Sequence, residues 1–312
     1  MRLDALRAGD WVLLGPTAAG KTRLAARLAR ALGADVVVVD SRQVYRGLDL
    51  CSGKDRADYE LDDGPVLVHG MDRVELADEY SLFEFARDAR DCAAGLSAAG
   101  RSAVWCGGTG LYLDALLRGY HLPEAPVDEA WRRVADSRPL AELERELRAG
   151  ALPLHNRTDL EGRGRLLRAL EVSRAGRGRQ AEGPERGRDV TVLGLRWPAG
   201  RLRERIARRL DERLEQGLVR EVEELLAAGV PASRLHRLGL EPRWILRHLQ
   251  EGLSLPELRT GLAGEIWQLA RGQLSWFRRL ERAGVRIHWL DAEAPGDLLE
   301  RALALRSQAA PL

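Results

Sequence analysis

Lysine and cysteine are both scarce in this chain. Its 312 residues include 49 basic residues, yet only Lys21 and Lys54 are lysine and every other base is arginine. The three cysteines, Cys51, Cys92 and Cys106, have an odd count and no CxxC or other metal-ligand spacing. Such a set is typical of small buried side chains in a reducing compartment, so we expect a cytoplasmic protein.

Long apolar runs are also lacking. None approaches the roughly 18 residues that a membrane-spanning helix needs, so the sequence predicts no contact with a membrane. The N-terminal stretch MRLDALRAGDWVLLG carries acids and runs into an expected strand, unlike a signal peptide. With 45% hydrophobic and 31% charged residues the composition is that of a globular protein, and the length suggests about two domains or one domain with an insertion. The net charge of +2 does not indicate a partner.

The segment 15–22 reads GPTAAGKT. It stands between a short apolar strand expected at 10–15 and a helix expected to end at Gly33. In this setting the glycines let backbone N–H groups point at phosphate oxygens, and the helix N-terminus adds positive potential. Lys21 would add a point charge, and the Thr22 hydroxyl would bind Mg²⁺. The expected phosphate-binding residues here are Gly15, Thr17, Ala18, Ala19, Gly20, Lys21 and Thr22.

A second strand is expected at 35–39, where four valines in a row indicate a parallel strand buried on both faces. Asp40 and Ser41 follow it directly. Ligands bind at the carboxyl edge of an open parallel sheet, so Asp40 would lie near the phosphates as a metal-contacting group or a general base. The alternative interpretation is a helix N-cap, because Asp and Ser both serve there.

A third strand is expected at 102–106, and the glycine-rich turn Gly107–Tyr112 (GGTGLY) follows it. An NTP-hydrolysing P-loop protein usually ends such a strand with an acid that holds Mg²⁺ and water. Here the strand ends in Cys-Gly-Gly-Thr. The pattern therefore favours a cradle for a diphosphate and argues against a kinase or ATPase.

Together these segments resemble the tRNA dimethylallyltransferase family, or a divergent paralogue within it. In the first half, 15–22 resembles the family's GPTA-[SA]-GKT loop, 40–45 its DSxQVY, 80–85 its YSVxxF and 107–112 its GGTGLY. Further on, 168–172 resembles RALEV, 216–222 the GLxxEV turn, 238–241 IGYKE and 273–278 QxTWFR. The resemblance covers nearly the whole chain, from about residue 10 to residue 291.

The resemblance implies a fold and a reaction. The expected class is α/β, a P-loop NTPase-like parallel sheet flanked by helices, with a mainly helical insertion. The reaction would move a dimethylallyl group from dimethylallyl diphosphate to N6 of the adenosine beside the anticodon in tRNA, releasing diphosphate. Lys21, and Thr22 with Mg²⁺, would stabilise the departing charge, and Asp40 would accept the proton. Thr109 would lie beside the reacting centre, unless it only forms the turn.

Other contacts are implied in the same way. Arg205 and Arg209 match the family's R-I-x-x-R pattern, and one of them would grip the diphosphate. Alternatively, both belong to a solvated basic face whose partners are the acids at 204, 211 and 212. The remaining substrate or tRNA contacts would be Ser41, Gln43, Tyr45, Lys54, Gly107, Gly108, Tyr112, Arg168 and Gln273.

The middle of the chain differs from the rest. Helices are expected within 124–150, and from Arg157 to Arg188 there are nine arginines, five acids and no strand pattern. We expect an insertion at 118–189 and a discontinuous core of 1–117 plus 190–312, with strands at 190–195 and 285–290 and helices across most of 201–290. Alone, such a basic stretch is typical of a solvated loop; the resemblance implies that it grips the anticodon stem-loop of tRNA. A monomer is the expected form.

Some segments depart from the family pattern. IGYKE becomes LGLEP at 238–242, and TRxYAKRQ becomes IWQLARGQ at 266–273. The three loops at 15–22, 40–45 and 107–112 are intact, which favours retained chemistry with altered acceptor contacts. Two alternatives stay open. One is a transferase that acts on a free adenine nucleotide, against which the basic insertion argues, and the other is a non-catalytic paralogue that only binds tRNA.

Overall fold

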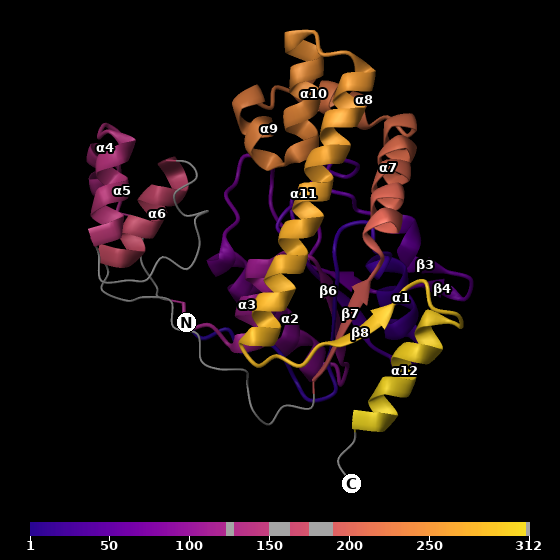
Figure 1. Cartoon of the computed structure of the whole chain (residues 1–312). Helices are drawn as coiled ribbons and strands as arrows, with labels where there is room; N and C mark the ends of the chain where they lie inside the picture. The colour runs from indigo at the N-terminus through magenta and orange to yellow at the C-terminus, as the bar shows by residue number, and fades with distance from the viewer. Residues whose placement is uncertain (123–127, 150–162, 175–189, 310–312) are drawn as a thin grey trace. The chain divides into compact units, whose positions relative to one another are not determined.

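The computed structural model describes residues 1–122, 128–149, 163–174 and 190–309 (Figure 1). The chain divides into two compact units. One comprises Met1–Leu3 with Arg118–Glu182, and the other comprises Asp4–Leu117 with Gly183–Leu312. In the described part of the chain, no helix is both long enough and apolar enough to cross a membrane.

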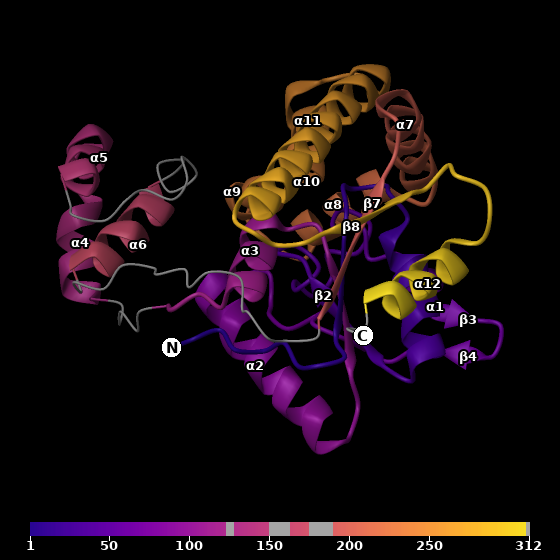
Figure 2. The same ribbon diagram turned by 60° about the horizontal axis from the view of Figure 1, so that its bottom comes forward.

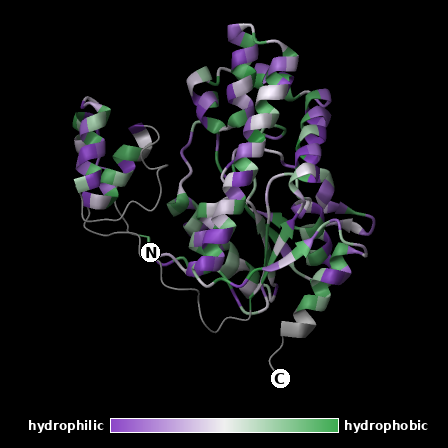
Figure 3. Cartoon of the chain, viewed as in Figure 1, coloured by the Kyte–Doolittle hydropathy of each residue, from purple (hydrophilic) through white to green (hydrophobic). Residues whose placement is uncertain are grey.

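A six-stranded sheet forms the centre of the larger unit. Its strands lie in the order β5-β2-β6-β1-β7-β8, and every neighbouring pair is parallel. The strands are β1 (Trp11–Leu14), β2 (Asp35–Val39), β5 (Val68–His69), β6 (Ala103–Gly107), β7 (Thr191–Arg196) and β8 (His288–Asp291), and a hairpin of β3 (Glu60–Leu61) and β4 (Gly64–Pro65) stands apart. All residues of β1, β2 and β6 are buried, as expected for parallel strands covered on both faces. The central strands are accordingly mainly hydrophobic in Figure 3.

Helices cover both faces of this sheet. α1 (Lys21–Leu32) and α12 (Leu298–Ala309) share one core with inward-facing residues of β1, β6 and β7. α2 (Leu82–Ala98) and α3 (Gly110–Arg118) lie on the other side of the strands (Figure 2). The predicted α/β class, a parallel sheet flanked by helices, is confirmed.

The ends of these helices follow from local sequence. α1 ends at Gly33, which takes the left-handed conformation (φ 64°) and donates its N–H to the carbonyls of Ala29 and Arg30. α2 begins at a capping box, in which the backbone N–H of Ser81 donates to Glu84 over 2.9 Å and the Ser81 hydroxyl accepts from Phe83 N. A 3₁₀ turn, Arg56–Tyr59, precedes the hairpin.

Five helices form a second core beside the sheet. They are α7 (Ala199–Glu215), α8 (Leu218–Ala227), α9 (Ala232–Leu238), α10 (Leu240–Glu251) and α11 (Leu255–Arg282). In Figure 1 most of this helical group lies beyond the carboxyl end of β7, where α7 begins. Their apolar faces pack against Val44, Tyr45 and Leu48 of the loop that follows β2. The expectation that 201–290 is mainly helical, with a strand near its end, is confirmed.

The smaller unit is helical where it is described. α4 (Glu129–Asp136), α5 (Leu140–Ala149) and α6 (Arg163–Arg174) enclose a small core that includes Leu143, Leu147 and Leu166. The rest of the predicted basic stretch, 150–162 and 175–189, lies outside the described residues. All three cysteines are free thiols; Cys51 and Cys106 are buried and Cys92 is half-buried.

Candidate active site

The GPTAAGKT segment forms a loop between β1 and α1. Ala18 (φ 61°) and Gly20 (φ 87°) take left-handed conformations, which turn the chain tightly before the helix. No side chain caps the N-terminus of α1, and its first turn holds no acid. The amides at this helix end therefore have the geometry and the field that favour an anion.

Lys21 is directed back into the loop. Its Nζ donates to the carbonyl of Pro16 over 2.7 Å. The pKa of this ammonium is lowered from 10.5 to about 8, mainly by burial; the positive charge of Arg209 contributes to the shift, while Cys106, Asp40 and Asp55 oppose it. A cation that has already lost water is one for which a phosphate is a strong partner.

Asp40 lies at the carboxyl end of β2, where the sequence predicts it. Its Oδ1 accepts the backbone N–H of Arg42 (2.8 Å) and of Gln43 (3.3 Å). No helix follows, because 41–44 form a bend and a turn, so the helix N-cap interpretation is wrong. The side chain instead closes an Asx-type turn through one oxygen, which orients the carboxylate.

Ser41 and Thr109 connect the two carboxyl-edge loops. The backbone N–H of Ser41 donates to Thr109 Oγ1 over 3.1 Å. The carbonyl of Thr109 accepts the N–H groups of Tyr112 and Leu113, so Thr109 also begins α3. Thr109 therefore does form its turn, and its hydroxyl additionally holds the residue next to Asp40.

The glycines at the end of β6 and in the turn that follows permit three close approaches. A Cβ at Gly107 would collide with the Val39 carbonyl on β2, and one at Gly110 would collide with the ring of Trp276 on α11. At Gly108 it would meet Gln273 Nε2 at 2.5 Å. Glycine is needed here because two strands and a helix meet at this turn.

Gln273 joins the phosphate loop to this turn. Its Oε1 accepts the N–H of Thr17 over 2.8 Å, and its Nε2 donates to the Gly108 carbonyl over 3.0 Å. The sequence predicts a substrate contact at Gln273. Both ends of the amide bind the protein's own backbone, and the predicted substrate contact stays a prediction.

We expect Gln273→Ala to loosen the phosphate loop. The variant loses two hydrogen bonds and leaves Thr17 N and Gly108 O without them, which costs about 1–3 kcal/mol in the free energy of unfolding. Urea denaturation and titration with inorganic diphosphate measure the loss of stability and of affinity. Gln268→Ala, an exposed glutamine of the same helix, is the control. Unchanged diphosphate affinity in Gln273→Ala would contradict a role in shaping the loop.

Two arginines of α7 lie against the loop. Arg205 Nε donates to the Ala18 carbonyl over 2.8 Å, and its guanidinium lies 4.3 Å from the ring centroid of Trp197. Arg209 reaches Thr17 Oγ1 (3.4 Å) and pairs with Asp55 (2.5 Å). Burial lowers the pKa of Arg205, and the charges of the neighbouring arginines add to this effect.

The alternative of a solvated basic face is therefore wrong for Arg205 and Arg209. The acids of α7 that were its expected partners bind other arginines. Those pairs are Arg201 with Glu204, Arg208 with Glu212, and Arg259 with Asp211.

Lys54 is bonded inside the protein. Its side chain is fully buried, and Nζ donates to the Tyr45 carbonyl (2.6 Å), Asp49 (2.8 Å) and Asp72 (2.6 Å). All three N–H bonds of the ammonium are thus used inside the protein. Lys54 holds the loop after β2 together, and its predicted substrate or tRNA contact stays a prediction.

Two tyrosine rings expected at the substrate lie in the core. Tyr45 is 2% exposed and Tyr112 is 4% exposed. Tyr112 stacks on Phe85 with ring centroids 4.3 Å apart, and Arg234 lies over the Tyr45 ring. Both rings pack in the core, and their predicted substrate contacts stay predictions. Gln43 binds the Gly53 carbonyl over 3.0 Å.

Arg168 belongs to the smaller unit. It pairs with the buried Glu171 over 3.0 Å within α6, and Arg132 of α4 pairs with the same carboxylate. Its predicted tRNA contact stays a prediction.

Several residues of the site were not singled out by sequence. Trp197 Nε1 donates to the Ala19 carbonyl over 3.0 Å, and Glu221 accepts the N–H groups of 49, 50 and 51. Arg213 and Glu241 form an ion pair at 3.5 Å beside Asp55. Glu221 and Glu241 lie in segments that match family motifs, but the partners of these side chains are distant in sequence and only the fold brings them together.

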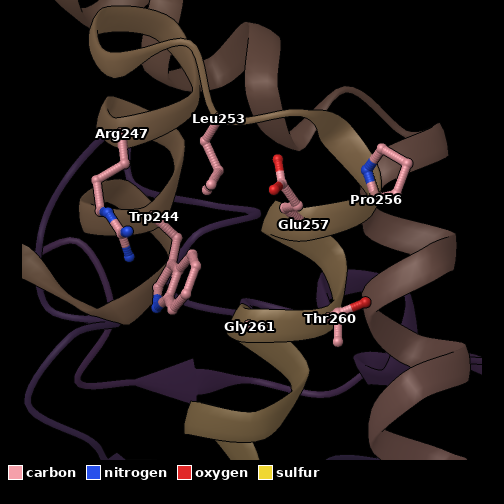
Figure 4. Close-up of a pocket in the computed structure, with 7 residues that line it drawn as sticks. All are labelled: Trp244, Arg247, Leu253, Pro256, Glu257, Thr260 and Gly261. Atoms are coloured by element: carbon pink, nitrogen blue, oxygen red, sulfur yellow. The ribbon is translucent and has the colours of Figure 1, made fainter.

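A pocket at the other end of α11 has no part in this arrangement. It has a volume of about 480 Å³ and is lined by Trp244, Arg247, Leu253, Pro256, Glu257, Thr260 and Gly261 (Figure 4). Gly261 and Gln273 are separated by about 18 Å along the helix axis. None of the predicted site residues lines this pocket.

Oxygen ligands for a metal are few. In the described residues no three His, Cys, Asp or Glu side chains come together as a metal cluster. Thr22 in the first turn of α1 and Asp40 at the end of β2 offer a hydroxyl and a carboxylate. Both are oxygen ligands of the kind that a hard divalent cation takes.

The chain is similar to known proteins over nearly its whole length. The sequence profile of the IPP transferase family matches residues 43–280, more than half of the chain, and that of the isopentenyl transferases matches 10–63. This chain belongs to the IPP transferase family. Two relatives of this IPP transferase are a tRNA dimethylallyltransferase 1 of Hahella chejuensis, 45% identical (94% of this chain, 95% of the relative), and one of Porphyromonas gingivalis, 40% identical (91% and 94%).

Solved structures support the fold of this IPP transferase. A tRNA isopentenylpyrophosphate transferase of Bacillus halodurans superposes with a TM-score of 0.66 at 24% identity, covering 96% of this chain and 94% of the other. A eukaryotic dimethylallyltransferase acting on tRNA superposes with a TM-score of 0.75 at 19% identity, covering 96% and 78%. The departures from the family pattern lie on α10 and α11, whereas the phosphate loop and both carboxyl-edge loops keep it.

Proposed function

We propose that this enzyme transfers a dimethylallyl group from dimethylallyl diphosphate to N6 of the adenosine beside the anticodon in tRNA, releasing diphosphate. Relatives that carry the name tRNA dimethylallyltransferase at 40–45% identity over most of the chain support it. The observation that carries the proposal is the joining of three loops at one sheet edge. Gln273 ties the phosphate loop to the glycine-rich turn, and Thr109 ties that turn to Ser41, next to Asp40.

The phosphate loop would bind the donor's diphosphate. Loop amides and the N-terminus of α1 would point at the anion, and Lys21, Arg205 and Arg209 would add positive charge around it. Because negative charge grows on the departing oxygens as the allylic carbon loses its bond, these fixed charges lower the barrier. Mg²⁺, when held by the Thr22 hydroxyl, would neutralise part of the same charge.

Asp40 would accept the proton that N6 loses on attack. The exocyclic amine of adenine is a weak nucleophile, so a carboxylate within reach of its N–H favours bond formation. Two backbone N–H groups fix the carboxylate through Oδ1, which limits its rotation. Thr109 would keep this turn in place through Ser41.

Recognition of tRNA would use the smaller unit. Its basic composition suits phosphate contacts that do not depend on sequence, and the insertion would grip the anticodon stem-loop. The target adenosine must leave its stack to reach a base and a bound donor. We expect a monomeric enzyme in the cytoplasm, where tRNA is modified.

The test is incorporation of labelled dimethylallyl diphosphate into tRNA from a strain that lacks its own modifying enzyme. Label in an adenosine beside the anticodon is the expected result. Two parallel reactions address the alternatives. Label in AMP but not in tRNA would replace the acceptor by a free nucleotide, and tight tRNA binding without product would mean a non-catalytic paralogue.

A further inference from the structure

Three arginines occupy one face of α7. Arg205, Arg209 and Arg213 recur every fourth residue, so their side chains leave the helix on the same side. Arg205 and Arg209 contact the phosphate loop, as described above. Arg213 is one turn farther from that loop and is only 8% exposed. A buried guanidinium next to that of Arg209 needs carboxylates to be stable there.

Two carboxylates neutralise these arginines: Asp55 is shared by Arg209 and Arg213, and Glu241 pairs with Arg213. Asp55 offers one oxygen to each neighbour: Oδ2 lies 2.5 Å from Arg209 and Oδ1 lies 4.0 Å from Arg213. Glu241, at the start of α10, pairs with Arg213 from the other side at 3.5 Å. Burial raises the pKa of Glu241, and the positive charge of Arg213 counters the shift. The order of charges is thus Arg209, Asp55, Arg213, Glu241.

Gly53 leaves room for the side chains of Arg209 and Arg213. It takes a left-handed conformation (φ +67°), and a Cβ there would meet Arg209 Nη2 at 2.8 Å and collide with the guanidinium of Arg213. The carbonyl of Gly53 also accepts from Arg209 over 3.4 Å. The backbone between Gln43 and Asp55 therefore fits around both side chains.

We propose that Arg213 and Glu241 are positioning residues, which orient Arg209 toward the donor's diphosphate through the carboxylate that Arg209 and Arg213 share. The inference deepens the proposed function and rests on it. Among the described residues, the ion pairs of Arg213 are with Asp55 and Glu241, so its influence on the phosphate loop passes through Arg209. Glu241 keeps Arg213 from drawing Asp55 away from Arg209.

Glu241 departs from the family pattern. It lies in LGLEP, where the pattern IGYKE has a lysine. A lysine beside the buried Arg213 would place two cations together, whereas the glutamate balances the guanidinium.

The experiment measures inorganic diphosphate binding by calorimetry, and KM and kcat for dimethylallyl diphosphate, in the full chain. Arg213→Met and Glu241→Leu are each expected to raise the Kd for diphosphate and the KM for the donor about tenfold, with little change in kcat. On an Arg209→Met background, Arg213→Met should add nothing further. Arg201→Met, an exposed arginine of the same helix, is the control.

A double variant distinguishes an effect on the position of Arg209 from a loss of protein stability. Each single change leaves a buried charge without its partner and so lowers thermal stability, whereas Arg213→Met/Glu241→Leu removes both charges and should regain it. If the pair positions Arg209, the double variant folds well and still binds diphosphate about tenfold more weakly than the unaltered protein. Wild-type affinity in the stable double variant would overturn the inference.

The same measurements keep the two proposals apart. If the unaltered protein binds diphosphate but transfers no prenyl group, only the proposed function is contradicted. The role of Arg213 and Glu241 is still tested, because the Kd for diphosphate can be compared between the unaltered protein and the variants. Normal prenyl transfer in the unaltered protein, together with unaltered diphosphate affinity in Arg213→Met, Glu241→Leu and their double variant, would overturn the role of the pair alone.

Discussion

Lys21→Ala lowers kcat/KM for prenyl transfer by about 10²- to 10³-fold, the size expected when a preorganised charge is removed from a developing anion. The ammonium lies inside the phosphate loop, where it binds the Pro16 carbonyl. Because it is already stripped of water, its attraction for the leaving group is larger than that of an exposed lysine. Steady-state kinetics with labelled donor measure the change.

Arg23→Ala is the matched control for this variant. Arg23 is an exposed base two residues farther along α1 and should change kcat/KM by less than about twofold, as exposed charges contribute little. Equal losses in the two variants would mean that net charge, and not the position of Lys21, is what matters.

The pKa of Lys21 makes the effect depend on pH. Since the pKa is about 8 in the folded protein, affinity for inorganic diphosphate should fall as the pH rises above that value and the ammonium loses its proton. Stability moves the other way. An unfolded chain holds this proton up to its ordinary pKa of 10.5, so between the two values the unfolded state binds more protons and the contribution of Lys21 to folding rises with pH. A Lys21→Arg variant, whose charge persists, should bind diphosphate with no decline near pH 8.

Asp40→Asn lowers kcat by about 10²- to 10⁴-fold, the usual contribution of a general base. Asparagine keeps an oxygen acceptor for the N–H groups of Arg42 and Gln43, so the turn survives while the basicity is lost. Affinities for diphosphate and tRNA should therefore stay near those of the unaltered enzyme. Single-turnover kinetics with saturating donor measure the chemical step directly.

Two comparisons sharpen the Asp40 experiment. Asp62→Asn, at an exposed position in the hairpin turn, should leave kcat unchanged. Asp40→Ala removes the turn contacts as well and should lose stability in addition to turnover. If Asp40→Asn retains turnover and only Asp40→Ala loses it, Asp40 closes the turn and is not the base.

The parts of the site that sequence determined are contiguous segments. The loop 15–22 could be predicted because its shape is dictated by its own glycines and by the strand and helix that flank it. The carboxyl-edge position of Asp40 and the glycine-rich turn followed from the same rule for parallel sheets. These conclusions need only a few consecutive residues, and the structure has β2, β6 and α1 where they require them.

The roles of single side chains could not be predicted in this way. Lys54 is an isolated lysine by sequence, and only the packing of Asp49, Asp72 and the Tyr45 carbonyl around it uses up its donors. Gln273 is 256 residues from Thr17, and no local pattern indicates that the two are bonded. The sequence left open whether Arg205 and Arg209 face solvent, which the approach of α7 to the loop decided.

There is a physical reason why the sequence determined some features and the tertiary structure decided others. Backbone shape and the sites that it creates depend on short-range sterics and on which residues alternate or repeat, so this protein's sequence by itself determined the α/β class, the phosphate loop and the edge of the sheet that holds the site. The partner of a polar side chain depends on which groups are buried beside it, because burial makes each unmade hydrogen bond costly. Only the tertiary structure therefore decided that Gln273 and Lys54 bind the protein itself, and that Asp55 is shared between Arg209 and Arg213.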